Sequence, residues 1–548
     1  MPPVPVRCTD TLTRCVPFPC WTNVTPTIPL VPNSNSPSAI MGMSTTAATA
    51  PRQTITVIDN RTGKSYEFPI TRNSVKAVDF KKVSSQRRPT FGAEHADREE
   101  DETEGGLRVH DPGFMNTTVI ESRITYINGT DGVLRYRGYP IEQLAESSNH
   151  LESSYLLIYG QLPTKEQYRL WEDEILHHSY VHEDMTQLIR AHRYDSHPML
   201  ILSSGFASLG AFAPEANPSL QGQKLYTKGD ASLAIMDKQI YRIMGKAITL
   251  AAMSYRVRQG RPFNRPPVGL SYAGTFLYLL DTLNEREYRP NPVFEKALDV
   301  LFLLHADHEL NASCATGLQV GSTLADPYSV VSAACAALSG PLHGGANQSV
   351  VEMLGRIGSP DKVPEFLEKV KRKEEVLSGF GHRVYKTTDP RSKVIRKIAD
   401  DVFKITGRSP LLDTALALND AANKDDYFVS RKLGANVDYW SGLIYTQIGF
   451  PTDMFTVIFA VARVAGWLAH WRQMMLQQKV TIWRPRQIYV GEGERDYVSI
   501  EKRASAAEGE GERSNAPVPV HHGGDSRRRA LASYVDEKGR QFVGGSKL

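Results

Sequence analysis

Apolar residues recur at intervals of three and four positions in segment after segment from Ile141 onward, whereas long alternating stretches are scarce. This spacing places apolar side chains along one face of a helix, so it predicts an all-α fold for the body of the chain. Strand-like alternation appears earlier, at residues 53–70, and a further strand or turn region spans 107–139. We therefore expect a mainly helical protein with a short N-terminal β region.

Three polar segments interrupt this pattern. They are a Pro/Thr-rich leader (1–50), a charged linker (84–106) and a Gly/Ser/Arg-rich tail (496–548). Segments of this composition bury too little apolar surface to offset the entropy that ordering costs, so all three are predicted to be disordered. The N-terminal β region then occupies residues 51–83, and the helical body begins at residue 107.

The composition argues against several classes of partner. The 548 residues include 64 basic and 60 acidic side chains, and the net charge of +4 creates no field that would require nucleic acid or a membrane. The longest apolar run, from Met454 to Ala462, ends at Arg463 and is too short to cross a bilayer.

Cys314 and Cys335 are not spaced as a disulfide framework or a zinc site, which favours a reducing compartment. The sequence also lacks a Walker loop and a GxGxxG turn, which argues against nucleotide-dependent chemistry.

One predicted helix carries two histidines on its apolar face. That face comprises Phe294, Ala297, Leu298, Leu301, Leu304, His305 and His308. With Asp307 and Glu309 nearby, the two histidines could bind a metal ion, as in a metal-dependent hydrolase. Their spacing differs from that of the HExxH motif, and buried core histidines are the simpler interpretation. Both interpretations stay open at this point.

Four polar clusters combine ionisable side chains with glycines or with the end of an apolar run. They are HADHELN (305–311), GPLHGGAN (340–347), GFGHRVYKTTDPR (379–391) and NVDYWSG (436–442). At such positions the backbone can approach a ligand closely, and burial can shift a pKa. We take these clusters as the candidate site.

His343 and Asp438 are candidates for acid–base chemistry. His343 is flanked by glycines and precedes a predicted helix, whose positive end would lower its pKa and keep the imidazole neutral. A neutral imidazole can donate a hydrogen bond to a carbonyl oxygen, although a turn histidine that caps the helix is an alternative. Asp438 precedes Tyr439 and Trp440, and desolvation against these rings would make it a stronger base. Its alternative is an ordinary helix N-cap.

The remaining candidates are cationic. His382 follows the loop 379–381 and precedes several basic residues, an arrangement typical of an anion pocket or of a solvated basic turn. Arg463 interrupts an apolar helix, where a guanidinium needs an anionic partner from a ligand or from within the protein. Arg484 and Arg486 bracket a proline shortly beyond it and offer further groups that bind carboxylates.

Six motifs occur together in the order and approximate spacing of one known family. They are HADHELN, GPLHGGANQ, GFGHRVYKTTDPR, NVDYWSG, FAVARVAGW and RPRQIYVG. The stretch from Leu107 to Gly491 resembles the citrate synthase family, and in particular its bacterial-type branch, which also supplies peroxisomal enzymes. The resemblance implies a large helical domain (107–344 and 451–495) and a small domain (345–450) that closes over the substrates and excludes bulk water. It also implies a site without a metal, which argues against the metal interpretation of the two histidines.

The resemblance further implies a role for each catalytic candidate. Asp438 would remove a methyl proton from acetyl-CoA, and His343 would stabilise the resulting enol or enolate at the thioester oxygen. His382 would polarise and protonate the carbonyl of oxaloacetate as the new carbon–carbon bond forms. Hydrolysis of the citryl thioester would then release citrate and CoA.

The resemblance implies as well how the substrates are held. His308, Arg391 and Arg463 would bind oxaloacetate, and Arg484 would reach the site from the second subunit of a homodimer. Lys386 would lie near the phosphates of CoA. Because acetyl-CoA is a co-substrate, no cofactor would be bound permanently.

Alternatives to citrate synthase stay open within and outside the family. The pair Tyr439-Trp440 stands where Phe-Tyr is frequent in the family, and it borders the predicted base. A 2-methylcitrate or longer alkylcitrate synthase that uses another acyl-CoA is therefore the alternative function, because one methylene changes binding by only about 1 to 3 kcal/mol. A non-enzymatic helical scaffold is disfavoured, because the set of polar residues is intact.

The two ends of the sequence give competing indications of location. Ser546-Lys547-Leu548 spell the peroxisomal signal SKL, which an import receptor reads at a C-terminus. The leader is poor in acidic residues and contains Arg7 and Arg14, a weak transit-peptide composition. We expect a peroxisomal protein, with the mitochondrion as the alternative.

Overall fold

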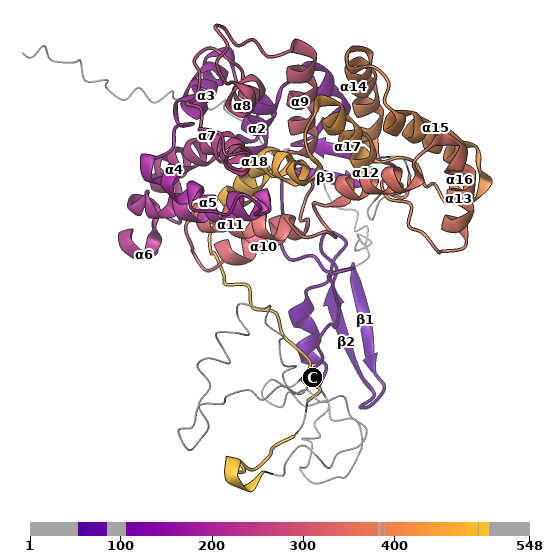
Figure 1. Cartoon of the computed structure of the whole chain (residues 1–548). Helices are drawn as coiled ribbons and strands as arrows, with labels where there is room; N and C mark the ends of the chain where they lie inside the picture. Colours follow the sequence, from indigo (N-terminus) through magenta and orange to yellow (C-terminus); the bar gives the residue numbers. More distant parts are fainter. Residues whose placement is uncertain (1–52, 85–105, 382–384, 388, 492, 504–548) are drawn as a thin grey trace, which may run out of the picture. The chain divides into compact units, whose positions relative to one another are not determined.

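The computed structural model describes residues 53–84, 106–381, 385–387, 389–491 and 493–503 (Figure 1). The predicted leader, nearly all of the charged linker, His382 and the SKL tripeptide lie outside the described residues. The chain divides into two compact units, one from Met1–His110 with Ile488–Leu548 and one from Asp111–Gln487. Each unit is described by itself.

The first unit contains the short β region that the sequence predicts. β1 (Thr54–Asp59) and β2 (Lys64–Pro69) form an antiparallel hairpin. Gly63 closes its turn with a φ of 71°, a conformation that residues with a Cβ adopt only with strain. The 3-10 helix η1 (Ala77–Lys82) follows the hairpin. Another 3-10 turn, η6 (Ile500–Lys502), lies in the segment predicted to be a disordered tail.

The second unit opens with a small antiparallel sheet. Its strands lie in the order β3 (Thr125–Asn128), β4 (Val133–Tyr136) and β5 (Tyr139–Pro140). This sheet confirms the strand region expected before residue 139, and β3 and β4 supply side chains that support the candidate site.

Helices make up most of the rest of the second unit, which confirms the all-α fold class. The first group comprises α1 (Ile141–Ser147), α2 (His150–Tyr159), α3 (Lys165–His177), α4 (Glu183–Arg190), α5 (Pro198–Ala211), α6 (Pro218–Gln221), α7 (Leu233–Arg258), α8 (Tyr272–Asp281), α9 (Pro292–His305), α10 (Ala312–Gly321) and α11 (Pro327–Leu338). The second group comprises α12 (Ala346–Ile357), α13 (Val363–Lys371), α14 (Pro390–Thr406), α15 (Pro410–Lys424), α16 (Asp426–Ser430) and α17 (Val437–Ile448), and α18 (Phe455–Met475) completes the unit. Side-chain caps define many helix starts, since Asn149, Asn311 and Asn436 each accept a backbone N–H from the following first turn.

α18 is the central core helix of the second unit. It packs against α2, α7, α9, α10 and α11, and nearly all of its residues are buried. The segment Thr452–Met475 is the one stretch among the described helices that is long and apolar enough to cross a membrane, but 94% of its apolar window is buried inside the protein. The apolar run therefore continues beyond Arg463, where the sequence pattern placed its end. The burial of this stretch among neighbouring helices is what a core helix shows.

The helices from α12 to α17 pack mainly against one another. α17 lies against α12 and α14, and α15 lies against α12, α13 and α16 (Figure 1). α14 also contacts α1 and α9, so it links this group to the earlier helices. These helices fall within residues 345–450, the segment predicted to form the small domain, and its rotation stays a prediction.

Candidate functional site

The end of α9 forms the first wall of the candidate site. The helix ends at His305, so His308 lies in the following turn and not on the helical face to which the sequence pattern assigned it. His305 is buried, and its Nδ1 lies 2.8 Å from the carbonyl of Leu301, to which it donates. His308 lies beside Tyr385, with 3.2 Å between Nε2 and Oη. Within the described part of the chain, no three His, Cys, Asp or Glu side chains gather as a metal site would require.

Asp307 connects this turn to neighbouring elements through hydrogen bonds. Its carboxylate accepts hydrogen bonds from Thr125 Oγ1 at 2.5 Å, His470 Nε2 at 3.3 Å and the backbone N–H of Glu309 at 3.2 Å. The hydroxyl of Tyr136 donates to the backbone carbonyl of Asp307 at 2.9 Å. Burial alone would raise the pKa of Asp307, but the neighbouring His470 holds it below its ordinary value. The turn that carries His308 is therefore held by a buried carboxylate.

Arg463 projects from the middle of α18 toward the same turn. Its side chain is 1% exposed, and Nε donates to the carbonyl of His305 at 2.6 Å. The guanidinium also lies 4.7 Å from the ring centre of Phe459. No carboxylate of the described residues lies within ion-pair distance of Arg463, so the internal salt bridge that the sequence left open is not observed there. A buried guanidinium with this partner set can bind an anionic ligand.

His343 lies in a tight turn ahead of α12. Its backbone N–H donates to Gly340 O at 2.9 Å, and Nε2 lies 2.9 Å from the hydroxyl of Ser313. The backbone N–H of Ser313 also donates to Nε2 at 3.2 Å, which requires the ring proton to be on Nδ1 in the neutral form. Burial, with a smaller contribution from Arg463, lowers the pKa of His343 to about 4. Burial is thus the main cause of the neutral imidazole, where the sequence pointed to the helix end.

Asp438 lies in the first turn of α17, but it is not the N-cap. Asn436 caps the helix by accepting the backbone N–H groups of Asp438 at 3.0 Å and Tyr439 at 3.2 Å. The side chain of Asp438 is therefore not used to start the helix. Burial raises its pKa to about 6, although Arg391 and, more weakly, Arg463 act in the opposite direction. A carboxylate with this pKa is ionised at neutral pH and is a stronger base than an ordinary aspartate.

Arg391 opens α14 and is paired with a carboxylate that the sequence reading had left without a role. Its Nε and Nη2 donate to the two oxygens of Asp389 at 3.0 and 2.8 Å, and both side chains are buried. Burial lowers the pKa of Arg391, but Asp389 raises it overall. The bidentate pair leaves further N–H donors of the guanidinium for a ligand. Lys386, in the loop before this helix, is exposed.

Arg484 lies in an extended arm beyond α18 and is exposed within the single chain. The arm is attached to α10 beside it, because the backbone N–H of Trp483 donates to Ser322 Oγ at 3.0 Å and the Gln319 side chain donates to the Trp483 carbonyl. The described contacts do not bring Arg484 to the other candidates of its own subunit.

Arg463 connects the candidates that the structure brings together. Its charge acts on the pKa of both His343 and Asp438, and Arg391 acts on Asp438 and on Arg463 itself. His308 joins them through Tyr385, whose pKa Arg391 also influences. An uncharged imidazole and a basic carboxylate therefore both lie within electrostatic range of the Arg463 guanidinium, a combination suited to ionising a carbon acid next to a bound dianion.

Tyr439 and Trp440 make their described contacts within the core. The hydroxyl of Tyr439 donates to Ala415 O at 2.6 Å, and its ring packs against Phe380. Trp440 lies beneath the guanidinium of Arg396, 5.2 Å from its ring centre. These contacts give the aromatic pair a packing role.

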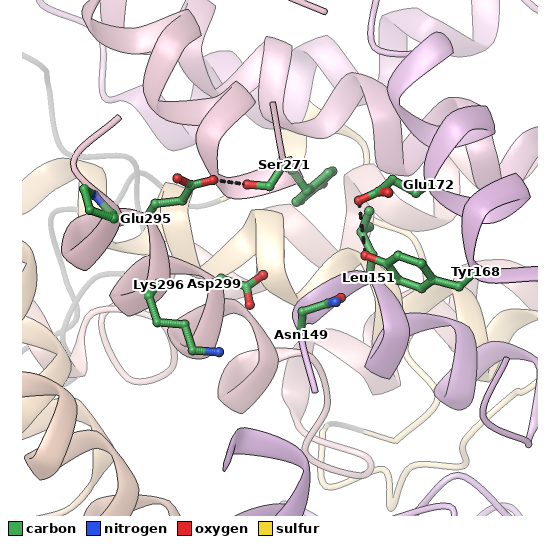
Figure 2. A pocket seen from close by; sticks show the side chains of 10 residues that line it. Asn149, Leu151, Tyr168, Glu172, Ser271, Glu295, Lys296 and Asp299 are labelled. Atoms are coloured by element: carbon green, nitrogen blue, oxygen red, sulfur yellow. Dashed lines mark hydrogen bonds between the residues drawn. The ribbon is translucent and has the colours of Figure 1, made fainter. Parts of the chain in front are cut away.

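A separate surface pocket of about 230 Å³ contains none of the candidate residues. It lies among α2, α3, α8 and α9 and is lined by Asn149, Leu151, Tyr168, Glu172, Ser271, Tyr272, Pro292, Glu295, Lys296 and Asp299 (Figure 2). Figure 2 shows two hydrogen bonds among its lining residues: the Ser271 hydroxyl donates to Glu295, and Tyr168 donates to Glu172 at 3.1 Å. Burial raises the pKa of Asp299 to about 6.

Comparisons with known proteins identify the family of this chain. Residues 113–486 match the family described as "Citrate synthase, C-terminal domain". A peroxisomal citrate synthase from Dictyostelium discoideum is 49% identical over 463 residues, which cover 84% of this chain and 90% of that protein. A glyoxysomal citrate synthase from Cucurbita maxima is 48% identical over 451 residues, which cover 82% and 84%.

Solved structures show the same fold. The citrate synthase of Pyrobaculum aerophilum superposes with a TM-score of 0.66 at 34% identity, covering 72% of this chain and 97% of that one. The Thermoplasma acidophilum enzyme, solved in a ternary complex with carboxymethyl coenzyme A and oxaloacetate, gives a TM-score of 0.63 at 31% identity, covering 71% and 98%. The chain therefore belongs to the citrate synthase family.

Proposed function

We propose that this acyltransferase condenses acetyl-CoA with oxaloacetate, with Asp438 and His343 acting on the acetyl group and the Arg463 cation holding oxaloacetate. The observation that carries the proposal is the matched pair of shifts: burial raises the pKa of Asp438 to about 6 and lowers that of His343 to about 4. At neutral pH one group is a free base and the other an uncharged donor. Groups whose environments separate their pKa values in this way divide acid and base roles.

The first step is the transfer of a methyl proton from acetyl-CoA to the Asp438 carboxylate. The electrons that are released move to the thioester oxygen, which accepts a hydrogen bond from His343 Nδ1–H. Ser313 supports this tautomer, because its backbone N–H donates to Nε2 at 3.2 Å. A donor held in this way stabilises charge as it develops in the transition state.

The second step forms the carbon–carbon bond. The enolate carbon attacks the ketone carbon of oxaloacetate, whose oxygen takes a proton from His382. Arg391, Arg463 and His308 hold the two carboxylates and orient the carbonyl, which lowers the entropy cost of the encounter. Water then cleaves the carbon–sulfur bond of the citryl thioester and releases citrate and CoA. Lys386 is placed near the CoA phosphates, and closure of the helices within 345–450 shields the intermediate from bulk water.

A panel of acyl-CoA substrates tests the function. With saturating oxaloacetate, kcat/KM should be highest for acetyl-CoA and should fall by about tenfold or more for propionyl-CoA and further for hexanoyl-CoA. The measurement is CoA release by the purified full-length chain. A propionyl-CoA value at or above the acetyl-CoA value would instead identify a 2-methylcitrate synthase, for which the comparisons give no support.

The exposed position of Arg484 fits a role in a second subunit of a homodimer. Mixing Asp438→Asn and Arg484→Ala chains at equal amounts, with subunit exchange, should restore about one quarter of the wild-type rate. Random pairing makes about half of the dimers mixed, and each mixed dimer has one intact site if Arg484 crosses the interface. If Arg484 served its own subunit, both sites of a mixed dimer would be defective and the mixture would show no gain.

The enzyme is peroxisomal, in line with the peroxisomal relative from Dictyostelium discoideum and the glyoxysomal relative from Cucurbita maxima. Recognition of Ser546-Lys547-Leu548 by an import receptor is the part of this assignment that we propose, because the tripeptide is the standard peroxisomal signal.

A further inference from the structure

One face of α18 forms a series of hydrogen bonds with the turn that follows α9. Arg463, Gly466 and His470 are spaced by three and four positions and therefore share that face. Arg463 Nε donates to His305 O at 2.6 Å, and Gly466 N donates to Ala306 O at 3.1 Å. Further along the helix, His470 Nε2 bonds the Asp307 carboxylate at 3.3 Å.

The contact is too close for any side chain at position 466. A Cβ on Gly466 would lie 2.4 Å from the carbonyl oxygen of Ala306 and 2.5 Å from Oδ1 of Asp307. Both distances are far below van der Waals contact, and one of the two obstacles is backbone. The glycine therefore allows the turn to lie directly on the helix.

Asp307 and His470 form the far end of this contact and are fully buried, with side chains 0% exposed. The carboxylate cannot reach a substrate, since Thr125 and His470 occupy its surroundings. It is nevertheless the residue next to His308, while His470 lies two turns along α18 from Arg463. The pair thus joins the two elements that carry these oxaloacetate ligands.

We propose that His470, acting through Asp307, is a positioning residue that sets the separation of His308 and Arg463 and thereby the affinity for oxaloacetate. The inference rests on the proposed function, which assigns His308 and Arg463 to that substrate. Removing the imidazole leaves a buried carboxylate without one of its three described donors, and the turn shifts to reach another. Oxaloacetate binding is therefore weakened, whereas acetyl-CoA binding is retained because Asp438 and His343 belong to other elements.

His470→Leu and His470→Gln provide the test. Leucine removes the donor, and it should raise the KM for oxaloacetate by about tenfold while the KM for acetyl-CoA stays within about twofold. The glutamine amide can replace Nε2–H as a donor, so it should bring the oxaloacetate KM back to within about threefold of wild type. His150→Leu is the matched control, because His150 is equally buried and packs between Tyr272 and Phe302, and none of its described contacts is with the turn after α9.

Two further variants keep the test decisive. Thr125→Val removes a different donor to the same carboxylate from a partly exposed position, and it should raise the oxaloacetate KM by about threefold even if His470→Leu fails to fold. Arg463→Gln checks the underlying assignment, since it should raise the oxaloacetate KM whether or not His470 has a positioning role. If Arg463→Gln weakens oxaloacetate binding but the His470 and Thr125 variants change both KM values equally or neither, the positioning role is wrong. If Arg463→Gln leaves oxaloacetate binding unchanged, the proposed role of Arg463 in holding oxaloacetate, on which this inference rests, is wrong.

Discussion

Replacing Asp438 by asparagine should lower kcat by about three orders of magnitude while the KM for oxaloacetate changes by less than about threefold. Asparagine keeps the size of the side chain but cannot take up a methyl proton. The Arg391 and Arg463 cations that hold oxaloacetate stay in place, so substrate binding is retained. Steady-state CoA release with both substrates varied separates the two constants.

The control and the pH profile make this result specific. Asp426→Asn alters another aspartate in the first turn of a helix, at an exposed position in α16, and should leave kcat unchanged. Because the catalytic form of Asp438 is deprotonated and its pKa is raised to about 6, wild-type kcat/KM should fall as the pH drops below about 6. A loss of less than about tenfold in Asp438→Asn would rule out this carboxylate as the base.

Replacing His343 by alanine should lower kcat by about 10²- to 10³-fold, the usual effect of removing one donor to a developing oxyanion. His343→Asn should recover a measurable part of that loss, because its amide can present an N–H close to the position of Nδ1. The comparison of the two variants by steady-state kinetics distinguishes a hydrogen-bond donor from a side chain that only shapes the turn. Equal activity in the alanine and asparagine variants would contradict the donor role.

Much of the site could be predicted from isolated residues whose chemistry conflicts with their surroundings. Arg463 stands within an apolar helix, and His343 lies among glycines, so each needs an explanation that packing alone does not supply. The structure gives both a buried position with few partners, as those conflicts suggested. The helical body could be predicted equally well, because its spacing of apolar residues repeats over many segments.

The hydrogen-bond partners of the site residues could not be predicted from the sequence in the same way. Asp389 lies two residues before Arg391, but the sequence does not say that its carboxylate turns back to form a bidentate pair. His470 and Asp307 are 163 positions apart, and only the packing of α18 on the turn after α9 brings them together. Such pairings depend on tertiary structure, which local sequence patterns do not reveal.

Two errors arose from relying on a local pattern, which was extended too far in the first case and ended too early in the second. The apolar periodicity of α9 runs through to His308, but the chain leaves the helix after His305, and Glu309 adopts a left-handed conformation with a φ of 57°. The charge of Arg463 was read as the end of an apolar run, although α18 continues to Met475. In both cases neighbouring elements decide where the helix ends. Asp307 in the turn after α9 accepts a hydrogen bond from Thr125 of β3, and α18 is enclosed by other helices.

Exchange of the acetyl methyl protons with solvent tests the paired action of Asp438 and His343 most directly. The enzyme is incubated in D₂O with acetyl-CoA and malate, a 2-hydroxy analogue of oxaloacetate that cannot be attacked, and deuterium in the methyl group is followed by mass spectrometry. Wild-type enzyme should incorporate deuterium, His343→Ala should do so far more slowly, and Asp438→Asn should not exchange although it still binds both ligands. Exchange by Asp438→Asn at the wild-type rate would show that another group ionises the substrate.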